Sequence, residues 1–304
     1  MSQDKIEQTF TVTSPARLKL SNIRGSVEIH TGEEGVISVT AIKQSHTGDA
    51  EQTKIEVSQD ADGTVVATTK FGEGSWQWLF GSKPCEVDYV VKAPRQCSLK
   101  VNGVSSEASV EGFEGEFEFN SVSGDLALNN LTGPVKINTV SGDVSGSHLA
   151  GPLDLKTVSG DVSLTESSLP TINANTVSGD LDLRTPLADG PYHFKSVSGD
   201  VRLTAAPETR CTVELHGVSG DFSTAFPVSR SSHGHGSLTA DVQGGGVKVC
   251  LNTVSGDLSL ESSGEIPPAP AFSGASSAVD RRAILERIER GEMSVEEGLS
   301  QLKV

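Results

Sequence analysis

Apolar and polar residues alternate with a period of two through most of the chain, in segments that recur about every twenty residues. When the repeats are aligned on a shared Val-Ser-Gly-Asp tetrapeptide, the positions five and three residues before the valine and four residues after it are apolar. These positions hold Phe117/Phe119/Leu126, Val135/Ile137/Val144, Leu153/Leu155/Val162, Ile172/Ala174/Leu181, Tyr192/Phe194/Val201, Val213/Leu215/Phe222 and Val249/Leu251/Leu258. Alternation of this kind predicts β-strands with one buried face, so each repeat is expected to contribute two short strands.

The tetrapeptide gives the repeat its period. It occurs seven times, beginning at Val122, Val140, Val158, Val177, Val197, Val218 and Val254. The steps are 18 to 21 residues, except for a last step of 36 residues, which we interpret as two periods with one degenerate copy between them. A fixed period of this size is typical of a solenoid, in which each repeat buries its apolar face only against its neighbours.

The sequence therefore predicts an all-β fold, a β-solenoid. We expect a right-handed parallel β-helix with 18–21 residues per coil, because two or three strands per period of 18 residues fit one coil better than a meander. The glycine of the tetrapeptide suits a sharp corner between two strands. A further leucine in the early repeats is expected to close a third side; these are Leu131, Leu149, Leu169 and Leu187. An antiparallel barrel, with two-residue hairpin turns at the tetrapeptides, is the alternative.

Four segments follow from the changes in pattern. Residues 1–100 read as an N-terminal β region with degenerate repeats, of which Ser21–His30 is one, and with a hairpin signal at Asp62-Gly63. Residues 101–262 are the repeat solenoid, continuous with that region. Residues 263–277 are rich in Ser, Pro and Gly and read as a flexible linker. Residues 278–304 switch to helical periodicity and predict a short two-helix module.

Stacking the repeats in register predicts a column of carboxylates. Its members are Asp125, Asp143, Asp161, Asp180, Asp200, Asp221 and Asp257. Adjacent carboxylates ~5 Å apart repel by about 1 kcal/mol in water, so something must offset the repulsion. Backbone N–H groups at each corner would do so, and a bound calcium ion is the alternative. We favour the backbone hydrogen bonds and assign these aspartates an architectural role.

Composition narrows the function. The chain has 304 residues and a formal net charge of −16, which disfavours nucleic acid and anionic lipid as partners. No apolar stretch is long enough for a membrane span, and the first residues lack a signal-peptide core, so we expect a cytoplasmic protein unless a partner recruits it to the membrane. The four cysteines form no Cys-x-x-Cys pair. We therefore assign no catalytic residue, no cofactor and no metal, and regard His233 and His235 as chance neighbours in a Gly/Ser loop.

Two clusters are candidates for protein binding. Trp76, Trp78 and Phe80 crowd into a glycine-rich segment, which we expect to cap the solenoid and which could instead be an exposed contact surface. In the predicted helices, apolar residues fall on one face of each; they include Ile284, Leu285, Ile288, Leu299 and Leu302. Helices this short are marginal alone. They should pack as a hairpin, dimerise or dock on a partner. We favour recruitment of a protein partner over a tethered helical cap, because a cap needs no flexible linker.

The chain resembles a known family at several places. The opening FTVTSPARLKLSNIRGSVEIHTGEEGVISVTAIK, the central VDYVVKAPRQCSLKVNGVSSEASVEG and the Val-Ser-Gly-Asp series are similar to the bacterial putative-adhesin, or Toast-rack, β-strand-repeat family. The tail is similar to the short SHOCT-like two-helix module. The resemblance implies a bacterial β-solenoid without catalytic residues, related to proteins of envelope-stress systems.

Three functions are compatible with these features. The first is a non-enzymatic scaffold for protein–protein interaction, in envelope-stress signalling, whose helical tail recruits a partner. The second is self-assembly into a cytoskeletal-like or adhesive homo-oligomer, because an uncapped solenoid end is an unpaired edge. The third, a glycan-active β-helix enzyme, is disfavoured because a residue repeated seven times signals architecture, whereas a catalytic site is needed once.

Overall fold

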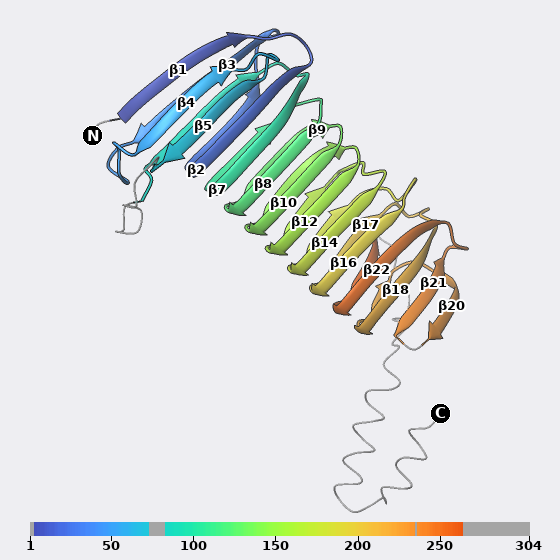
Figure 1. Ribbon diagram of the computed structural model, residues 1–304. Helices are drawn as coiled ribbons and strands as arrows, with labels where there is room; N and C mark the ends of the chain where they lie inside the picture. Colours follow the sequence, from blue (N-terminus) through green and yellow to red (C-terminus); the bar gives the residue numbers. More distant parts are fainter. Residues whose placement is uncertain (1–2, 73–82, 235, 264–304) are drawn as a thin grey trace, which may run out of the picture. The chain divides into compact units, whose positions relative to one another are not determined.

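The computed structural model of the protein describes residues 3–72, 83–234 and 236–263. All regular secondary structure in these residues is β-strand, and the strands lie side by side in a long series that departs from chain order near both ends (Figure 1). Trp76, Trp78, Phe80 and the expected helices of residues 278–304 lie outside the described residues. The predictions made for them stay predictions.

The regular part of the solenoid has two faces, each made of one strand per coil. The first face holds β8 (Phe117–Ser123), β10 (Val135–Ser141), β12 (Leu153–Ser159), β14 (Ile172–Ser178) and β16 (Tyr192–Ser198). The second face holds β9 (Leu126–Thr132), β11 (Val144–Ala150), β13 (Val162–Thr165), β15 (Leu181–Arg184) and β17 (Val201–Ala205).

Strands of consecutive coils pair in parallel, with equivalent residues opposite one another. Val135 of β10 is opposite Phe117 of β8 and Leu153 of β12, and Val144 of β11 is opposite Leu126 of β9 and Val162 of β13. This register confirms the parallel β-solenoid with one tetrapeptide per coil. The antiparallel barrel is wrong for this region, because a barrel of hairpins would pair neighbouring strands in opposite directions.

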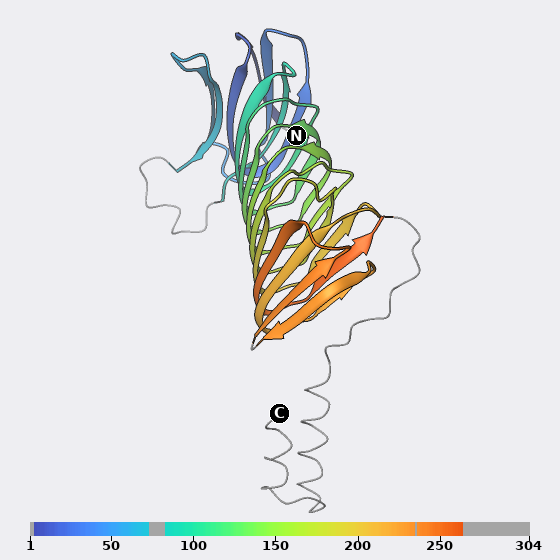
Figure 2. The same cartoon turned by 90° about the vertical axis from the view of Figure 1, so that its right-hand side faces the viewer.

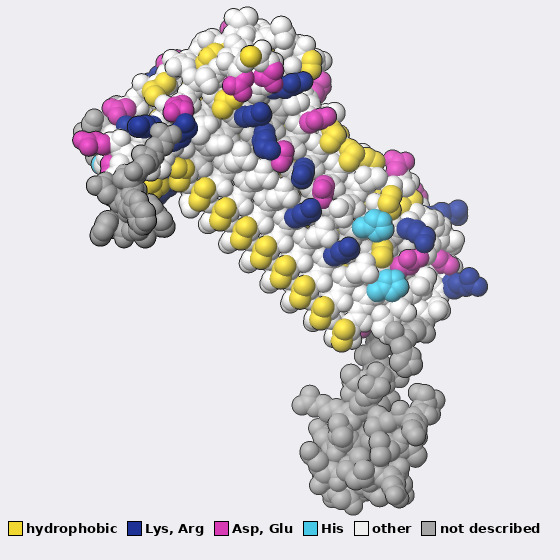
Figure 3. Space-filling model, viewed as in Figure 1, with side chains coloured by type: hydrophobic (Ala, Val, Ile, Leu, Met, Phe, Trp, Pro, Cys, Tyr) yellow, Lys and Arg dark blue, Asp and Glu magenta, His cyan; other side chains and the backbone are white. Residues whose placement is uncertain are grey.

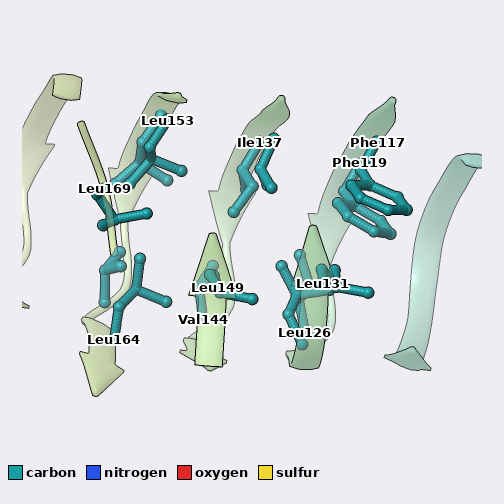
Figure 4. Packing of buried hydrophobic residues seen from close by; sticks show 14 of the residues in the cluster. Phe117, Phe119, Leu126, Leu131, Ile137, Val144, Leu149, Leu153, Leu164 and Leu169 are labelled. Atoms are coloured by element: carbon teal, nitrogen blue, oxygen red, sulfur yellow. The ribbon is translucent and has the colours of Figure 1, made fainter. Parts of the chain in front are cut away.

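The core is the narrow space between the two faces, where apolar side chains of successive coils stack in rows (Figure 4). Phe117 and Phe119 belong to two neighbouring rows, and their rings stack with centroids 6.5 Å apart and an interplanar angle of 8°. Leu131, Leu149 and Leu169 are fully buried and close the third side, as predicted. Because each coil contributes only a thin layer, the core is long and continuous rather than thick.

Glycine is required at the corners because the coils approach there backbone to backbone. Gly142 has a φ of +148°, and a Cβ on it would lie 2.4 Å from the carbonyl oxygen of Gly124 in the preceding coil. Gly160 repeats this arrangement, with a φ of +134° and a distance of 2.3 Å to the carbonyl oxygen of Gly142. No residue with a Cβ fits such a contact without a shift of the backbone, which explains the glycine in every tetrapeptide.

The coil order changes at the C-terminal end. β22 (Val247–Ser255) pairs in parallel with β16 on one side and with β18 (Cys211–Ser219) on the other. In the same way, β23 (Leu258–Ser262) lies between β17 and β19 (Phe222–Thr224). The last coil of the chain is therefore inserted between the two coils that precede it in sequence.

This insertion corrects our interpretation of the 36-residue step. The residues between the last two tetrapeptides contain no degenerate coil. They form an antiparallel hairpin of β20 (Val228–Gly234) and β21 (Ser237–Val242), and β21 pairs antiparallel with β18 (Figure 2). The hairpin covers the outer edge of β18, so the chain returns on the inner edge of that strand.

The N-terminal end is closed in a similar way. The degenerate repeat at Ser21–His30 is part of β2 (Ala16–Thr31), which pairs along its length with β7 (Cys97–Glu111), and β7 pairs with both β8 and β9. On its other side β2 pairs with β5 (Val65–Phe71) and β6 (Glu86–Ala93).

Antiparallel pairs complete this end. β5 pairs with β4 (Thr53–Gln59) through the predicted turn at Asp62-Gly63, which confirms that hairpin. β6 pairs with β3 (Val36–Gln44), and β3 pairs with β1 (Gln3–Thr11). The N-terminal end thus finishes in antiparallel pairs, and at the C-terminal end the first face finishes in the antiparallel strands β21 and β20.

Candidate functional site

The predicted aspartates form one column along the corner that follows the first face. The Oδ1 of every aspartate except Asp221, which lies in the terminal coil, accepts a hydrogen bond from the backbone N–H of the aspartate in the next coil: Asp125 from Asp143, and Asp143 from Asp161, both at 2.9 Å. The pattern continues through Asp180 and Asp200 to the inserted coil. The predicted backbone hydrogen bonds are therefore present, although the donor belongs to the neighbouring coil rather than to the same corner.

The order of this column follows the inserted coil. Asp200 accepts from the N–H of Asp257, and Asp257 accepts from the N–H of Asp221, at 2.9 and 2.8 Å. One oxygen of each of the first six carboxylates in spatial order thus holds adjacent coils together. Beside the column runs a polar groove of about 460 Å³, lined by the Ser-Gly-Asp segments of the later coils. The bonding of the carboxylates agrees with the architectural role that we assigned to them.

A second column, which sequence reasoning missed, is apolar and exposed. The valine of each tetrapeptide points outward, and Val104 of β7 extends the row. We call this row the valine ladder; in spatial order it is Val104, Val122, Val140, Val158, Val177, Val197, Val254 and Val218. It is visible as the line of hydrophobic side chains along the edge of the molecule in Figure 3.

The valine ladder is the main apolar feature of the surface. Val122 is 49% exposed and Val158 46%, whereas Val218, in the terminal coil, is 87% exposed. Within the described ranges, these valines are all of the exposed large hydrophobic residues. The alternation already contained this result, because residues five and three positions before the valine point inward and the valine must then point outward.

Amide side chains flank the valine ladder on the first face. Asn120 Nδ2 donates to Asn102 Oδ1 at 2.9 Å, and Asn138 Nδ2 donates to Asn120 Oδ1 at 2.8 Å. Lys156 and Lys195 occupy the same position in later coils. A shallow groove of about 410 Å³ lies between this row and the valines.

Charged side chains form a further row on the first face, next to a groove of about 610 Å³ along the beginnings of its strands. The row begins Lys19, Lys100, Glu118, Lys136 and Asp154. Lys100 Nζ lies 2.9 Å from Glu118 Oε2. This hydrogen bond, with others from the surroundings, lowers the pKa of the Glu118 carboxyl below its usual range. The charges largely neutralise one another, which leaves the valine ladder as the distinctive surface.

A comparison with family models shows the family to which this chain belongs. The family model described as Toastrack DUF4097 matches residues 16–261, which is most of the chain. The chain belongs to the Toastrack DUF4097 family. No curated protein sequence matches it.

One solved structure supports the fold, and a second is also similar to this chain. A putative adhesin from Bacteroides fragilis has 10% sequence identity and a TM-score of 0.50, and the match covers 85% of this chain and 98% of that one. A putative adhesin from Parabacteroides distasonis has 11% identity and a TM-score of 0.45, with 85% and 97% of the two chains covered. At this identity the likeness concerns the fold alone.

The thiols of this Toastrack protein give no sign of nucleophilic chemistry. Cys85, Cys97 and Cys211 are buried, whereas Cys250 is half-buried. Burial raises the pKa of Cys97 and of Cys211 to about 12, so both stay protonated near neutral pH.

No helix able to cross a membrane occurs in the part of the Toastrack chain that the structure describes.

Proposed function

We propose that this Toastrack protein is a non-enzymatic scaffold that binds protein through its valine ladder, and that the occupant of the ladder is a second copy of the chain. The observation that carries the proposal is the concentration of the exposed large hydrophobic residues in one straight row. Contiguous apolar rows of this extent are unusual on monomers and mark interaction surfaces.

The spacing of the ladder favours a second copy. Its valines recur once per coil, at the interstrand distance of ~4.8 Å. A partner that contacts all of them must present apolar groups at the same interval over the same length. Another copy of the solenoid does so, because two valine rows of equal spacing can face each other coil by coil.

The charges beside the ladder favour one orientation of the two copies. Lys156 and Lys195 lie on one side of the valines, and the aspartate column lies on the other. A two-fold axis along the ladder makes the two rows parallel and places the lysine side of each copy opposite the aspartate side of its partner. An axis across the ladder would instead place like charges opposite one another. We therefore propose a parallel, two-fold dimer.

Sedimentation equilibrium with the full chain tests the occupant. The wild type is expected to show a concentration-dependent dimer, and a triple variant with Val140→Thr, Val158→Thr and Val177→Thr is expected to dissociate more readily. Threonine keeps the shape and strand preference of valine and adds a hydroxyl to the contact. The matched control, Ser145→Thr with Ser163→Thr, changes exposed residues of the second face and should leave dimerisation unchanged.

Disulfide trapping tests the orientation. In the parallel arrangement each ladder residue meets its own equivalent, so Val122→Cys, near one end, is expected to cross-link two copies under mild oxidation. In an antiparallel arrangement only a central position would do so. A wild type that remains monomeric at high concentration, or a valine triple variant that dimerises as well as the wild type, would overturn the self-association proposal. A different protein retained only by an intact ladder would replace the second copy as its occupant.

The tail has a separate place in the proposal. We propose that residues 278–304 recruit another protein, in an envelope-stress response, because the apolar residues Ile284, Leu285 and Ile288 recur at helical spacing. Affinity capture tests this by comparing the proteins retained by the full chain with those retained by a chain ending at Ile266. Partners retained only by the full chain support recruitment by the tail, and equal retention by both contradicts it.

A further inference from the structure

Three side chains with metal-binding groups converge on the first face near the C-terminal end of the solenoid. The ligand atoms of Glu214, His216 and Cys250 all lie within 4.8 Å of one another. Glu214 and His216 lie on β18, and Cys250 lies on the neighbouring β22, opposite Glu214 in the strand register. Alternation sets all three outward, because Val213, Leu215, Val249 and Leu251 fill the inward positions.

We propose that Glu214, His216 and Cys250 form a zinc-binding site. A thiolate, an imidazole and a carboxylate are the three ligand types that Zn²⁺ takes in proteins, and three such groups leave a fourth tetrahedral position for water. The thiolate also selects zinc over magnesium and calcium, which prefer oxygen ligands. His216 is exposed, so an ion can enter from solvent without opening the core.

Each of two ligands has a partner that the ion would replace. Lys248 Nζ lies 3.0 Å from Glu214 Oε1, and Asn252 Nδ2 donates to Cys250 Sγ at 3.5 Å. Lys248 neutralises the carboxylate and competes with a cation, so its removal should strengthen zinc binding. This competition gives the site a signature that an unspecific surface cluster lacks.

The position of the site links it to the inserted coil. An ion held by β18 and β22 joins the coil that is terminal in space to the coil that comes last in the chain. It would act as a clamp at the point where chain order and spatial order differ. Zinc is therefore expected to raise the thermal stability of the protein as well as to bind.

Metal titration of the untagged full chain, freed of metal by chelator, tests the site. Calorimetry with Zn²⁺ is expected to give one ion per chain. Co²⁺, used as the spectroscopic substitute, should show a thiolate charge-transfer band that Cys250→Ser abolishes. His216→Ala and Glu214→Gln should each weaken zinc binding at least about tenfold, the usual scale for loss of a metal contact. Lys248→Ala should strengthen it.

The control variants separate this site from other metal-binding groups. A double variant with His233→Ala and His235→Ala, which removes two other histidines of the chain, should bind zinc like the wild type. Zinc should raise the melting temperature of the wild type and of this control, but not that of Cys250→Ser. Binding that survives Cys250→Ser and is lost in the double-histidine variant, or the absence of any binding by the wild type, would overturn the proposal.

Discussion

Three threonines, each one residue before a valine of the valine ladder, allow the effect of a buried hydroxyl on the stability of the core to be measured. Thr139, Thr157 and Thr176 point inward from β10, β12 and β14 and are 4 to 6% exposed. Their Oγ1 atoms are buried and have no hydrogen-bond partner among the described residues. Burying an unpaired hydroxyl costs roughly 1–3 kcal/mol, because its hydrogen bonds to water are lost and not replaced.

Replacing one of these hydroxyls by a methyl group should therefore stabilise the protein. Valine has the shape of threonine and an equal or higher strand preference, and the added methyl contributes up to about 0.8 kcal/mol of burial. We expect Thr157→Val to raise the free energy of unfolding by about 1–2 kcal/mol. For a domain of this size, each kcal/mol corresponds to about 2–4 °C in the melting temperature.

At the same position of another coil, the buried hydroxyl has a hydrogen-bond partner. Ser196 stands in this row on β16, but its Oγ donates to the carbonyl oxygen of Gly199 at 3.1 Å. Ser196→Ala should lower the free energy of unfolding by about 1 kcal/mol, because it removes a bond and leaves a carbonyl unpaired. Urea denaturation followed by circular dichroism measures both variants. If Thr157→Val destabilised the protein as much as Ser196→Ala does, the threonine hydroxyls would have partners and the reasoning would be wrong.

Two further predictions concern the corners and the buried ionisable groups. Gly160→Ala should cost several kcal/mol, because its Cβ would lie 2.3 Å from a carbonyl oxygen of the preceding coil. Gly63→Ala, at a φ of +82° with open space around it, should cost only the ~1–2 kcal/mol of the backbone conformation; thermal unfolding compares the two. Burial raises the pKa of Tyr89, Cys97 and Cys211 to about 12, from 10.0 for the tyrosine and 9.0 for the thiols. The folded protein keeps these protons to higher pH than the unfolded chain, so stability should be fully present below pH 9 and fall progressively toward pH 12, and a free energy of unfolding that is constant over this range would contradict the assignment.

The regular part of the fold was predictable because local and long-range signals coincide there. The alternation around Phe117, Val135 and Leu153 specifies both the buried face and the register, since a slip by one residue would turn every apolar side chain outward. The glycine at each corner is demanded by the close approach of coils, and the Asp62-Gly63 hairpin by its turn. Each of these features can be predicted from the residues of a single repeat or turn.

The valine ladder was harder to predict from the sequence, although the alternation of inward and outward positions contains it. Val140 and Val158 were used to align the repeats, and their own orientation follows from the inward positions before them. An apolar residue is usually assigned to the core, so the exposed position of these valines is easily missed. The zinc ligands Glu214 and Cys250 are 36 positions apart in sequence and meet only because of the inserted coil.

The inserted coil shows what a repeated motif leaves undetermined. Each tetrapeptide offers the same two edges: an aspartate oxygen that accepts on one side and an N–H that donates on the other. The motif therefore does not fix the order of the coils, because the same bond joins Asp200 to Asp257 and Asp257 to Asp221, in coils that do not follow chain order. The order is decided outside the motif, by the hairpin of β20 and β21. That hairpin covers the outer edge of β18, and a short turn then returns the chain to the inner edge, the one edge to which a parallel coil can still bind.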